Sequence, residues 1–344
     1  MVQIIDTPAL AQLLALIGIE TFLSELAERI ENDYARWPEF EKMPRVPFHS
    51  KDGVIELMPI ADAEWFSVKL VNGHPANPAK GLQTVTAVGV LADVATGYPR
   101  LLCEMTVLTA LRTAATSAVA ARHLANPGAT TLAMIGTGAQ GEFQALAFKR
   151  CLGIRTVRFH DTDAAAMAKF AANLRTASLQ LVPCSSVAQA IAGAEIITTA
   201  TAVRGARAVL TDSMVGPGVH VNAIGGDCPG KTEIDPRVLS RARIVVEYLA
   251  QTRCEGEIQS LGAEVPAAEL WEIIVGCSPG RSGRQQITLF DSVGFALEDY
   301  STLRYVYDKA RVLGIGRAVP LIPEPSDPKD LFGYISELAR RATG

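Results

Sequence analysis

One short loop carries several residue types that could do chemistry. The stretch NAIGGDCPGKTE, residues 222–233, places Asp227 directly after Gly225 and Gly226, with Cys228 and Lys231 close behind. Glycines let a backbone approach a ligand, and a carboxylate held against that ligand could act as a general base. Asp227 could equally be a turn former or a metal ligand. The metal interpretation is the weakest because no histidine lies nearby, and we predict no metal site.

A second glycine pattern predicts a dinucleotide site. In AMIGTGAQGEFQALAFKR, Gly136, Gly138 and Gly141 form a GxGxxG arrangement between an apolar strand and a helix. The first glycine permits a tight turn and the second lets the backbone approach a pyrophosphate. The third allows close packing of the helix, whose N-terminal amides attract the anion. The motif is weak by itself, but a strand precedes it and a helix follows it, as the site requires.

Asp161 is the acid that would complete this site. It ends the predicted strand TVRFHD, 20 residues beyond Gly141. A carboxylate there accepts hydrogen bonds from the adenosine ribose hydroxyls and repels a 2′-phosphate. Thr162 and Asp163 follow, so no arginine is placed to bind that phosphate. The sequence therefore favours NAD over NADP, with a strand-end turn as the alternative role for Asp161.

The elements around these motifs predict an α/β fold. Short apolar strands (TLAMIG, TVRFHD, EIITTATA, VHVNAIGG, RIVVEY) alternate with helices, which is typical of a parallel, doubly wound sheet. An alanine-rich helix over 109–125 precedes them. A helix is also expected over 7–37, with Thr7 as N-cap and Pro8 in its first turn. From Arg45 the sequence pattern changes from helical to short strand-like runs, with a predicted hairpin at DVATGYP. This change indicates a separate α+β unit.

Composition narrows the functional classes. The chain has 344 residues, 49% hydrophobic and 20% charged, which is enough for a large core and more than one domain. A net charge of −4 argues against a nucleic-acid binder. Six scattered cysteines without a CxxC pair argue against a disulfide framework or a zinc site. The N-terminus lacks the basic region of a secretory signal, and the apolar runs stop short of the roughly 20 residues that a membrane span needs. A cytoplasmic protein with no membrane partner is expected.

Longer motifs add a specific resemblance. The stretches RVPFHS, GVIELMP, KLVNGHPANP, ALRTAATS, IGTGAQGEFQALAF, NAIGGDCPGKTE, VVEYLAQTRCEGEIQ and FDSVGFALEDY occur in that order between about residues 45 and 308. The sequence resembles the ornithine cyclodeaminase/μ-crystallin family, and most closely its bacterial ornithine cyclodeaminases. Several long motifs in one order are far more specific than GxGxxG.

The resemblance implies an activity and an architecture. These enzymes convert L-ornithine to L-proline and ammonia with tightly held NAD, in proline biosynthesis and in ornithine and arginine catabolism. Hydride leaves the α-carbon, the δ-amine closes a ring on the resulting imine, ammonia departs, and the same hydride returns. The architecture would be a Rossmann NAD-binding domain over 114–313 and an α+β substrate-binding and dimerisation domain over 1–113 and 314–344. A cytoplasmic homodimer is implied.

The resemblance also assigns residues to the substrate and to catalysis. Asp227 matches the catalytic acid/base, and burial would raise its pKa whereas the nearby Lys231 would lower it. Arg45 and Lys69 match the residues that hold the substrate carboxylate, and their charges suit that task. Each of these residues has a plainer alternative, as a turn former or a solvated surface charge. The remaining substrate positions are Glu56, Met58, Arg112 and Val293, where Glu56 could receive the distal ammonium or simply face solvent and Val293 could be core.

The resemblance assigns a larger set of residues to the cofactor. Arg112 is chemically persuasive, because a lone cation in an alanine-rich helix could meet a pyrophosphate. Thr201 ends a predicted strand at the edge where doubly wound sheets bind ligands. Both could otherwise be ordinary helix-surface and strand-end residues. The full predicted set is Thr84, Arg112, Gly136, Gly138, Ala139, Gln140, Gly141, Asp161, Thr201, Ile224, Gly225, Gly226, Asp227, Lys231 and Ser292.

Two alternatives remain open from the sequence. One is another activity of the same family, either an NAD(P)H-dependent cyclic imine (ketimine) reductase or a lysine cyclodeaminase. A single added methylene is a small discrimination that sequence motifs do not resolve. The other is a non-catalytic, dinucleotide-containing protein. That alternative is disfavoured because it would not need Arg45, Lys69 and Asp227 together.

Overall fold

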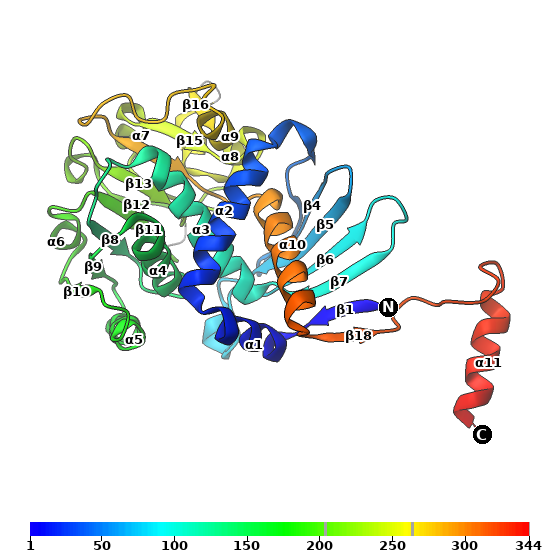
Figure 1. The fold of residues 1–344 in the computed structure, drawn as a ribbon. Helices are drawn as coiled ribbons and strands as arrows, with labels where there is room; N and C mark the ends of the chain where they lie inside the picture. Colours follow the sequence, from blue (N-terminus) through cyan, green and yellow to red (C-terminus); the bar gives the residue numbers. More distant parts are fainter. Residues whose placement is uncertain (203–204, 263–264, 344) are drawn as a thin grey trace.

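The computed structural model describes residues 1–202, 205–262 and 265–343, and it contains two large sheets (Figure 1). The predicted ranges 114–313 and 314–344 include residues that lie outside this description. The first sheet is mostly antiparallel, and only β1 and β7 pair in parallel. The order is β18-β1-β7-β6-β5-β4-β2, with β3 also paired to β4. Its strands are β1 (Val2–Ile5), β2 (Glu41–Lys42), β3 (Val46–His49), β4 (Val54–Ala61), β5 (Trp65–Gly73), β6 (Ala87–Asp93), β7 (Pro99–Glu104) and β18 (Arg317–Val319).

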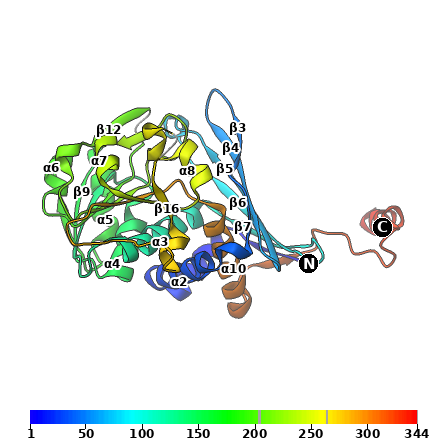
Figure 2. The same ribbon diagram turned by 90° about the horizontal axis from the view of Figure 1, so that it is seen from above.

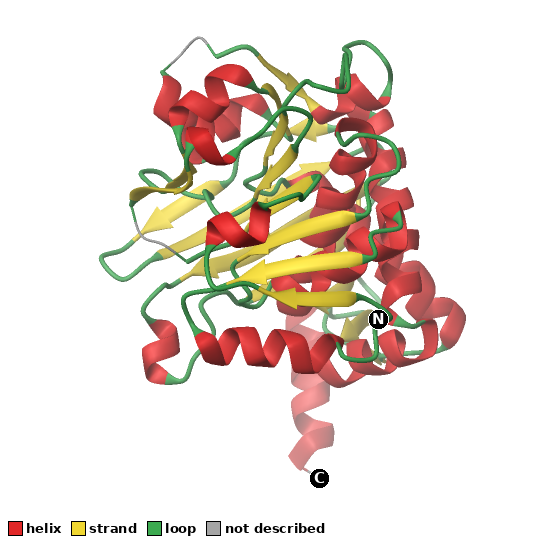
Figure 3. Cartoon of the chain, turned by 90° about the vertical axis from the view of Figure 1, so that its left-hand side faces the viewer, coloured by secondary structure: helices red, strands yellow, loops and turns green. Residues whose placement is uncertain are grey.

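The second sheet is parallel throughout, as the alternating pattern predicted (Figure 3). Its order is β10-β9-β8-β11-β13-β17-β15-β16, so the direction of winding reverses between β8 and β11. A small third sheet pairs β12 with β14. The strands concerned are β8 (Thr131–Ile135), β9 (Thr156–His160), β10 (Gln180–Pro183), β11 (Ile196–Thr199), β12 (Ala206–Leu210), β13 (His220–Ala223), β14 (Thr232–Ile234), β15 (Arg243–Val246), β16 (Ala267–Glu269) and β17 (Thr288–Asp291). The predicted α/β class is confirmed.

Helices cover both sheets and join them. The α-helices are α1 (Thr7–Ile17), α2 (Ile19–Ala35), α3 (Thr106–Leu124), α4 (Gly141–Leu152), α5 (Ala164–Leu174), α6 (Val187–Ile191), α7 (Pro236–Arg241), α8 (Leu249–Glu255), α9 (Leu270–Ile274), α10 (Ala296–Leu313) and α11 (Leu331–Thr343). Short 3₁₀ turns are η1 (Trp37–Glu39), η2 (Asn77–Lys80), η3 (Asp212–Met214) and η4 (Glu257–Leu261).

The first helical segment differs from its prediction. The N-cap is Asp6, whose side chain accepts a hydrogen bond from the Ala9 amide, and not Thr7. Gly18, at φ 82°, ends α1 and starts α2, and the two axes are bent by 95°. No single helix in the described residues is long and apolar enough to cross a membrane, and the bent pair α1 and α2 meets that test by length and composition only.

Helix α3 lies at the centre of the molecule (Figure 1). It contacts α2, α4 and α10, β6 of the first sheet, and β13 and β17 of the second. One hydrophobic cluster therefore includes side chains from both sides, among them Phe22, Leu108, Phe290 and Leu303. Alanines at the buried positions of α3 allow this close approach of neighbouring elements. The shared core fixes the antiparallel sheet relative to the parallel one.

Alternation along the first sheet separates two faces. On β4 and β5, Glu56, Met58 and Lys69 point inward and are buried. Their neighbours Ile55, Leu57, Phe66 and Leu70 point outward and are exposed. Helix α10 packs on β4, β5 and β6 from the inner side. Helix α11 contains no buried residue and lies away from the body of the chain (Figure 2).

Candidate functional site

Most of the predicted cofactor residues collect at one edge of the second sheet, whereas Thr84 precedes β6 and Arg112 lies on α3. Strands β9, β8, β11, β13 and β17 are consecutive and parallel, so their carboxyl ends lie along the same edge. Ligands of doubly wound sheets bind at this edge, where the strand order reverses. The residues that follow these strand ends are Gly136–Gly141 after β8, Asp161 after β9, Thr201 after β11, Ile224–Asp227 after β13 and Ser292 after β17.

The turn between β8 and α4 fits a dinucleotide. Gly136 has φ +94°, and a Cβ there would lie 2.4 Å from the carbonyl oxygen of Ala200. A Cβ at Gly138 would meet no atom within 4 Å, so its backbone is open to a ligand. A Cβ at Gly141 would press on the Phe170 ring of α5. The N-cap Gln140 makes no side-chain capping bond, so no capping side chain competes with an anion at the N-terminus of α4, although the Gly141 amide donates to the Gly138 carbonyl at 3.3 Å.

Asp161 braces this turn from the neighbouring strand end. Its Oδ2 accepts hydrogen bonds from the Thr137 amide at 2.7 Å and the Thr137 hydroxyl at 3.2 Å. Its Oδ1 accepts from the Asp163 amide at 3.0 Å, so the turn role foreseen as the alternative is also present. The side chain is only partly buried, which leaves the carboxylate within reach of a ribose.

Asp227 lies in the loop after β13, and it is paired rather than buried. Its side chain is 51% exposed, and Lys231 Nζ lies 2.9 Å from Oδ1. The burial expected for this carboxylate is therefore absent from this conformation, while Lys231 is in contact with it as expected. In the described residues, no group of three or more His, Cys, Asp or Glu side chains could hold a metal ion.

Three buried carboxylates, those of Asp291, Glu257 and Glu233, support the Asp227 loop through a series of hydrogen bonds, which we call the carboxylate ladder. Asp291 at the end of β17 accepts the amides of Glu257 and Ile258, both at 2.9 Å. Glu257 in turn accepts the amides of Glu233 and Ile234. Glu233 accepts the Thr201 hydroxyl at 2.5 Å.

The same ladder explains the two glycines before Asp227. A Cβ at Gly225 would lie 2.1 Å from a Glu233 oxygen, and a Cβ at Gly226 would lie 2.3 Å from a Glu257 oxygen. The glycines therefore make room for buried carboxylates, whatever ligand the loop approaches. Burial raises the pKa of Glu257 to about 7, despite the amides that it accepts.

Two of the predicted substrate cations share one acid at the inner face of the first sheet. Lys69 Nζ lies 2.8 Å from Asp299 Oδ2, and Arg112 Nε lies 3.2 Å from Asp299 Oδ1. Arg112 Nη1 also lies 2.5 Å from Glu298 Oε2. Gly294 admits this guanidinium, because a Cβ there would lie 2.5 Å from Arg112 Nη1. Burial, helped by the Arg112 charge, lowers the pKa of Lys69 to about 8.

Arg45 is the third predicted cation, and it bridges the two sheets. Its Nη1 lies 3.0 Å from Glu56 Oε2, and its Nη2 donates to the carbonyls of Val293 at 2.5 Å and Gly294 at 2.8 Å. Its Nε lies 3.0 Å from Glu255 Oε2 at the end of α8. The structure therefore brings Arg45, Glu56 and Val293 together, and the solvent-exposed alternative for these two charged side chains is wrong.

The other predicted residues lie around this core of contacts. Met58 is buried on β4 opposite Lys69 in the strand register. Ser292 is buried and its hydroxyl lies 2.5 Å from Glu247 Oε1. Thr84 precedes β6, and its carbonyl accepts the His74 amide at 2.8 Å. Within the part of the chain that the structure describes, no hydrogen bond joins its side chain to another predicted residue.

Several acids of this region were missed by the sequence reasoning. The motifs CEGEIQ and ALEDY were recognised as family-like, but no role was given to the acids inside them. A signal was present, because acids in otherwise apolar segments are expected to be paired when buried. The missed side chains are Glu233, Glu247, Glu255, Glu257, Asp291, Glu298 and Asp299.

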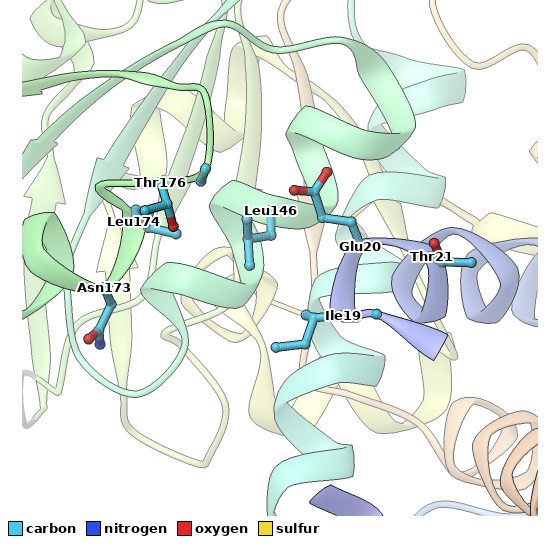
Figure 4. Close-up of a pocket in the computed structure, with 9 residues that line it drawn as sticks. Ile19, Glu20, Thr21, Leu146, Asn173, Leu174 and Thr176 are labelled. Atoms are coloured by element: carbon cyan, nitrogen blue, oxygen red, sulfur yellow. The ribbon is translucent and has the colours of Figure 1, made fainter. Parts of the chain in front are cut away.

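A hollow elsewhere on the surface is separate from these residues. It measures about 370 Å³ and lies between α2, α4 and the end of α5 (Figure 4). Glu20, Leu146, Asn173 and Thr176 are among its lining residues. Lys149 donates a hydrogen bond to Glu20, and Asn173 donates one to Glu142, so these two polar side chains of the hollow are already paired within the protein.

Comparisons with known proteins agree with this architecture. The model of the ornithine cyclodeaminase/mu-crystallin family matches residues 9–313. An ornithine cyclodeaminase of Brucella suis biovar 1 (strain 1330) is 55% identical over 334 residues, covering 97% of this chain and 93% of that protein.

Two solved structures share the fold over nearly the whole chain. A lysine cyclodeaminase, described with its recognition of L-lysine, L-ornithine and L-2,4-diaminobutyric acid, superposes with a TM-score of 0.90 at 31% identity. That match covers 96% of this chain and 98% of the other. An archaeal alanine dehydrogenase dimer with bound NAD gives a TM-score of 0.84 at 29% identity, covering 93% and 99%. The family match, the high identity and the shared fold lead to one conclusion: the chain belongs to the ornithine cyclodeaminase/mu-crystallin family.

Proposed function

We propose that the protein is an NAD-dependent ornithine cyclodeaminase, which converts L-ornithine to L-proline and ammonia. One observation carries the proposal: the 55% identity to the Brucella suis ornithine cyclodeaminase extends over 97% of the chain. The solved relatives described above, which bind NAD or recognise L-ornithine, support the same assignment at lower identity. The reaction would place the enzyme in proline formation and in the breakdown of ornithine and arginine.

The glycine turn, the N-terminus of α4 and Asp161 would hold the dinucleotide. When bound, NAD supplies a hydride acceptor that can later return the same hydride. Asp161 at the second strand end favours NAD, because it repels a 2′-phosphate. Most of the rest of the predicted set follows the same strand ends, at Thr201, the loop 224–227 and Ser292, with Lys231 beside Asp227. Thr84, before β6, and Arg112, on α3, belong to the other side of the site.

The three cations would hold the amino acid by its carboxylate. Arg45, Lys69 and Arg112 lie on the inner side of the first sheet, buried and close to the strand ends of the second sheet. Burial strengthens their attraction for a carboxylate, because little water screens it. Glu56, with Met58 and Val293, would line the rest of the substrate cavity and favour a second ammonium.

Asp227 would move protons at the substrate amine. Loss of hydride from the α-carbon requires an uncharged amine, so a base must first take a proton from it. The same carboxylic acid can return that proton to the departing ammonia. Lys231 Nζ, 2.9 Å from Asp227 Oδ1, would orient the carboxylate for this task.

The larger organisation is proposed with the function. The proposed domain ranges are 1–113 with 314–344, and 114–313. They are supported by the strand composition of the two large sheets, because the strands of the first fall in the former ranges and those of the second in the latter. A homodimer is supported by the exposed apolar outer face of β3 to β6, and one solved relative is a dimer. A cytoplasmic location is supported by the cysteines, which are all free thiols in the structure.

The decisive experiment incubates the purified protein with L-ornithine and a trace of NAD. Proline and ammonia are followed by NMR, and NADH by absorbance. Equal amounts of proline and ammonia without net NADH are the expected result.

Parallel incubations test the two alternatives within the family. Preference for L-lysine would move the assignment to a lysine cyclodeaminase. Reduction of a cyclic imine that consumes NADH, without proline from ornithine, would move it to the ketimine reductases. No turnover in any incubation would favour a non-catalytic binding protein.

A further inference from the structure

Glu255 is a buried acid at the end of α8, and neither the predicted site nor the proposed function assigns it a task. Its side chain is 10% exposed, and its Oε2 lies 3.0 Å from Arg45 Nε. Both atoms are buried, yet neither has a hydrogen bond of acceptable geometry. The two charges are therefore in contact, but the N–H of Nε is poorly aligned with the carboxylate.

The other partners of Arg45 are well aligned. Nη1 makes a proper hydrogen bond to Glu56, and Nη2 makes two to the carbonyls of Val293 and Gly294. A guanidinium has five N–H groups in a fixed plane. A substrate carboxylate that binds this guanidinium through Nε must displace Glu255, and this misaligned partner is the least costly one to displace.

We propose that Glu255 is a positioning residue that holds Arg45 in the free enzyme, exchanges its place at Nε for the substrate carboxylate, and takes up a proton as it does so. This inference rests on the proposed role of Arg45 in binding that carboxylate. The exchange replaces one carboxylate at Nε by another, and a solvent proton neutralises the acid that has been released.

The surroundings of Glu255 favour the proton. Its charged neighbours are Arg45 and the carboxylates of Glu56, Asp227 and Glu247, and the Cys228 thiol is close enough to respond to it. Burial raises the pKa of Glu255 to about 7 even with Arg45 in contact. Three acids and one cation surround it, so a Glu255 released from Arg45 would be an uncompensated buried charge unless it binds a proton.

The test is a titration of L-proline into the NAD-loaded protein by calorimetry at pH 6 and pH 8.5. L-proline carries one carboxylate and keeps its charges between these values. In buffers of different ionisation enthalpy, the wild type should take up close to one proton per proline at pH 8.5 and much less at pH 6. By linkage, its Kd should be more than about tenfold weaker at pH 8.5 than at pH 6, since Glu255 is then ionised and competes.

Variants separate the exchange from a structural role. Glu255→Gln should lose the proton uptake and bind proline more tightly than the wild type at pH 8.5, whereas Glu255→Asp should retain the uptake. Glu64→Gln, the same change at an exposed position between β4 and β5 and outside the site, is the control and should keep the uptake. Weaker proline binding by Glu255→Gln at both pH values, or proton uptake that survives in it, would overturn the proposal.

The outcome is independent of the proposed function. The titration needs no turnover, whereas the conversion of ornithine by the wild type tests the activity. An active cyclodeaminase without proton uptake would refute only the role of Glu255. A protein that is inactive on ornithine but shows the uptake would refute only the proposed activity.

Discussion

The charged side chains of this site form ion pairs with one another. Lys69 and Arg112 share Asp299, Arg45 lies between Glu56 and Glu255, and Asp227 meets Lys231. Removing one member of a buried pair leaves the other uncompensated, so substitutions here affect folding as well as function. Asp227 differs because it is half exposed, and it is therefore the residue where chemistry and stability separate most cleanly.

Asp227→Asn should leave the fold and NAD affinity unchanged while lowering turnover of ornithine by about 100-fold or more, since an amide cannot take the amine proton. Steady-state kinetics and a fluorescence titration with NAD provide the two readouts. Asp52→Asn, the same change at an exposed turn, is the control and should behave like the wild type. Turnover near the wild-type rate in Asp227→Asn would remove the assignment of this acid.

Among the elements, the turn from β8 to α4 depends on one backbone conformation. Gly136→Ala would place a methyl group 2.4 Å from the Ala200 carbonyl, at φ +94°. The free energy of unfolding should fall by about 2 kcal/mol or more, and NAD affinity by about tenfold or more. Urea denaturation and NAD titration measure these effects.

Gly153→Ala is the matched control for that turn. Gly153 ends α4 at φ +79°, but a Cβ there would meet no atom within 4 Å. Gly153→Ala should lower the free energy of unfolding by about 1 kcal/mol and leave the affinity for NAD unchanged. Equal effects of the two changes would show that backbone conformation alone, and not the contact with Ala200, makes Gly136 necessary.

The carboxylate ladder beneath the Asp227 loop should make stability depend on pH. Burial raises the pKa of Glu257 from 4.5 to about 7. A raised carboxyl pKa means that its contribution to stability is complete below pH 4.5 and is lost as pH rises through about 7. In Glu257→Gln, the fall in melting temperature between pH 5.5 and pH 8 should shrink by about 2 °C or more.

The exposed Glu64→Gln serves as the control for this measurement, and it should keep the wild-type dependence of melting temperature on pH. An unchanged slope in Glu257→Gln would place the pH dependence in other buried acids, such as Asp291 or Glu298, whose pKa values burial also raises.

At the scale of the whole molecule, the first sheet is apolar on both faces, and two buried charges lie among the apolar side chains of its inner face. Its inner face carries Glu56 and Lys69, while Leu57 and Leu70, opposite each other in the register, are exposed on its outer face. Exposed apolar patches of this kind usually mark an interface. The site and the proposed dimer interface thus use alternate residues of the same strands.

Leu57→Glu should therefore convert the proposed dimer to a monomer in sedimentation experiments. The substitution would bury a charge in the proposed interface, where the first sheet of one subunit meets that of the other. Val312→Glu, at an exposed position near the end of α10, should leave the assembly unchanged. A wild type that sediments as a monomer would exclude the dimer, and a dimeric Leu57→Glu would place its interface elsewhere.

The sequence by itself determined the parallel sheet, the glycine turn and the chemical type of most site residues. Those properties are local: strand and helix periodicities, glycine spacing and a strand-end acid are readable within about 30 residues. The family motifs added the residues that stand far apart in sequence. The sequence did not predict β1. Its four residues form a strand by pairing with β7 and β18, which lie far along the chain from it.

Only the tertiary structure decided which charges meet. Lys69 and Asp299 lie 230 positions apart, and Arg45 and Val293 lie 248 apart, so no local pattern links them. It also showed that Gly225 and Gly226 make room for Glu233 and Glu257. The physical reason is burial. A charge removed from water is costly unless it is paired, and the partner is set by which parts of the chain the fold brings together.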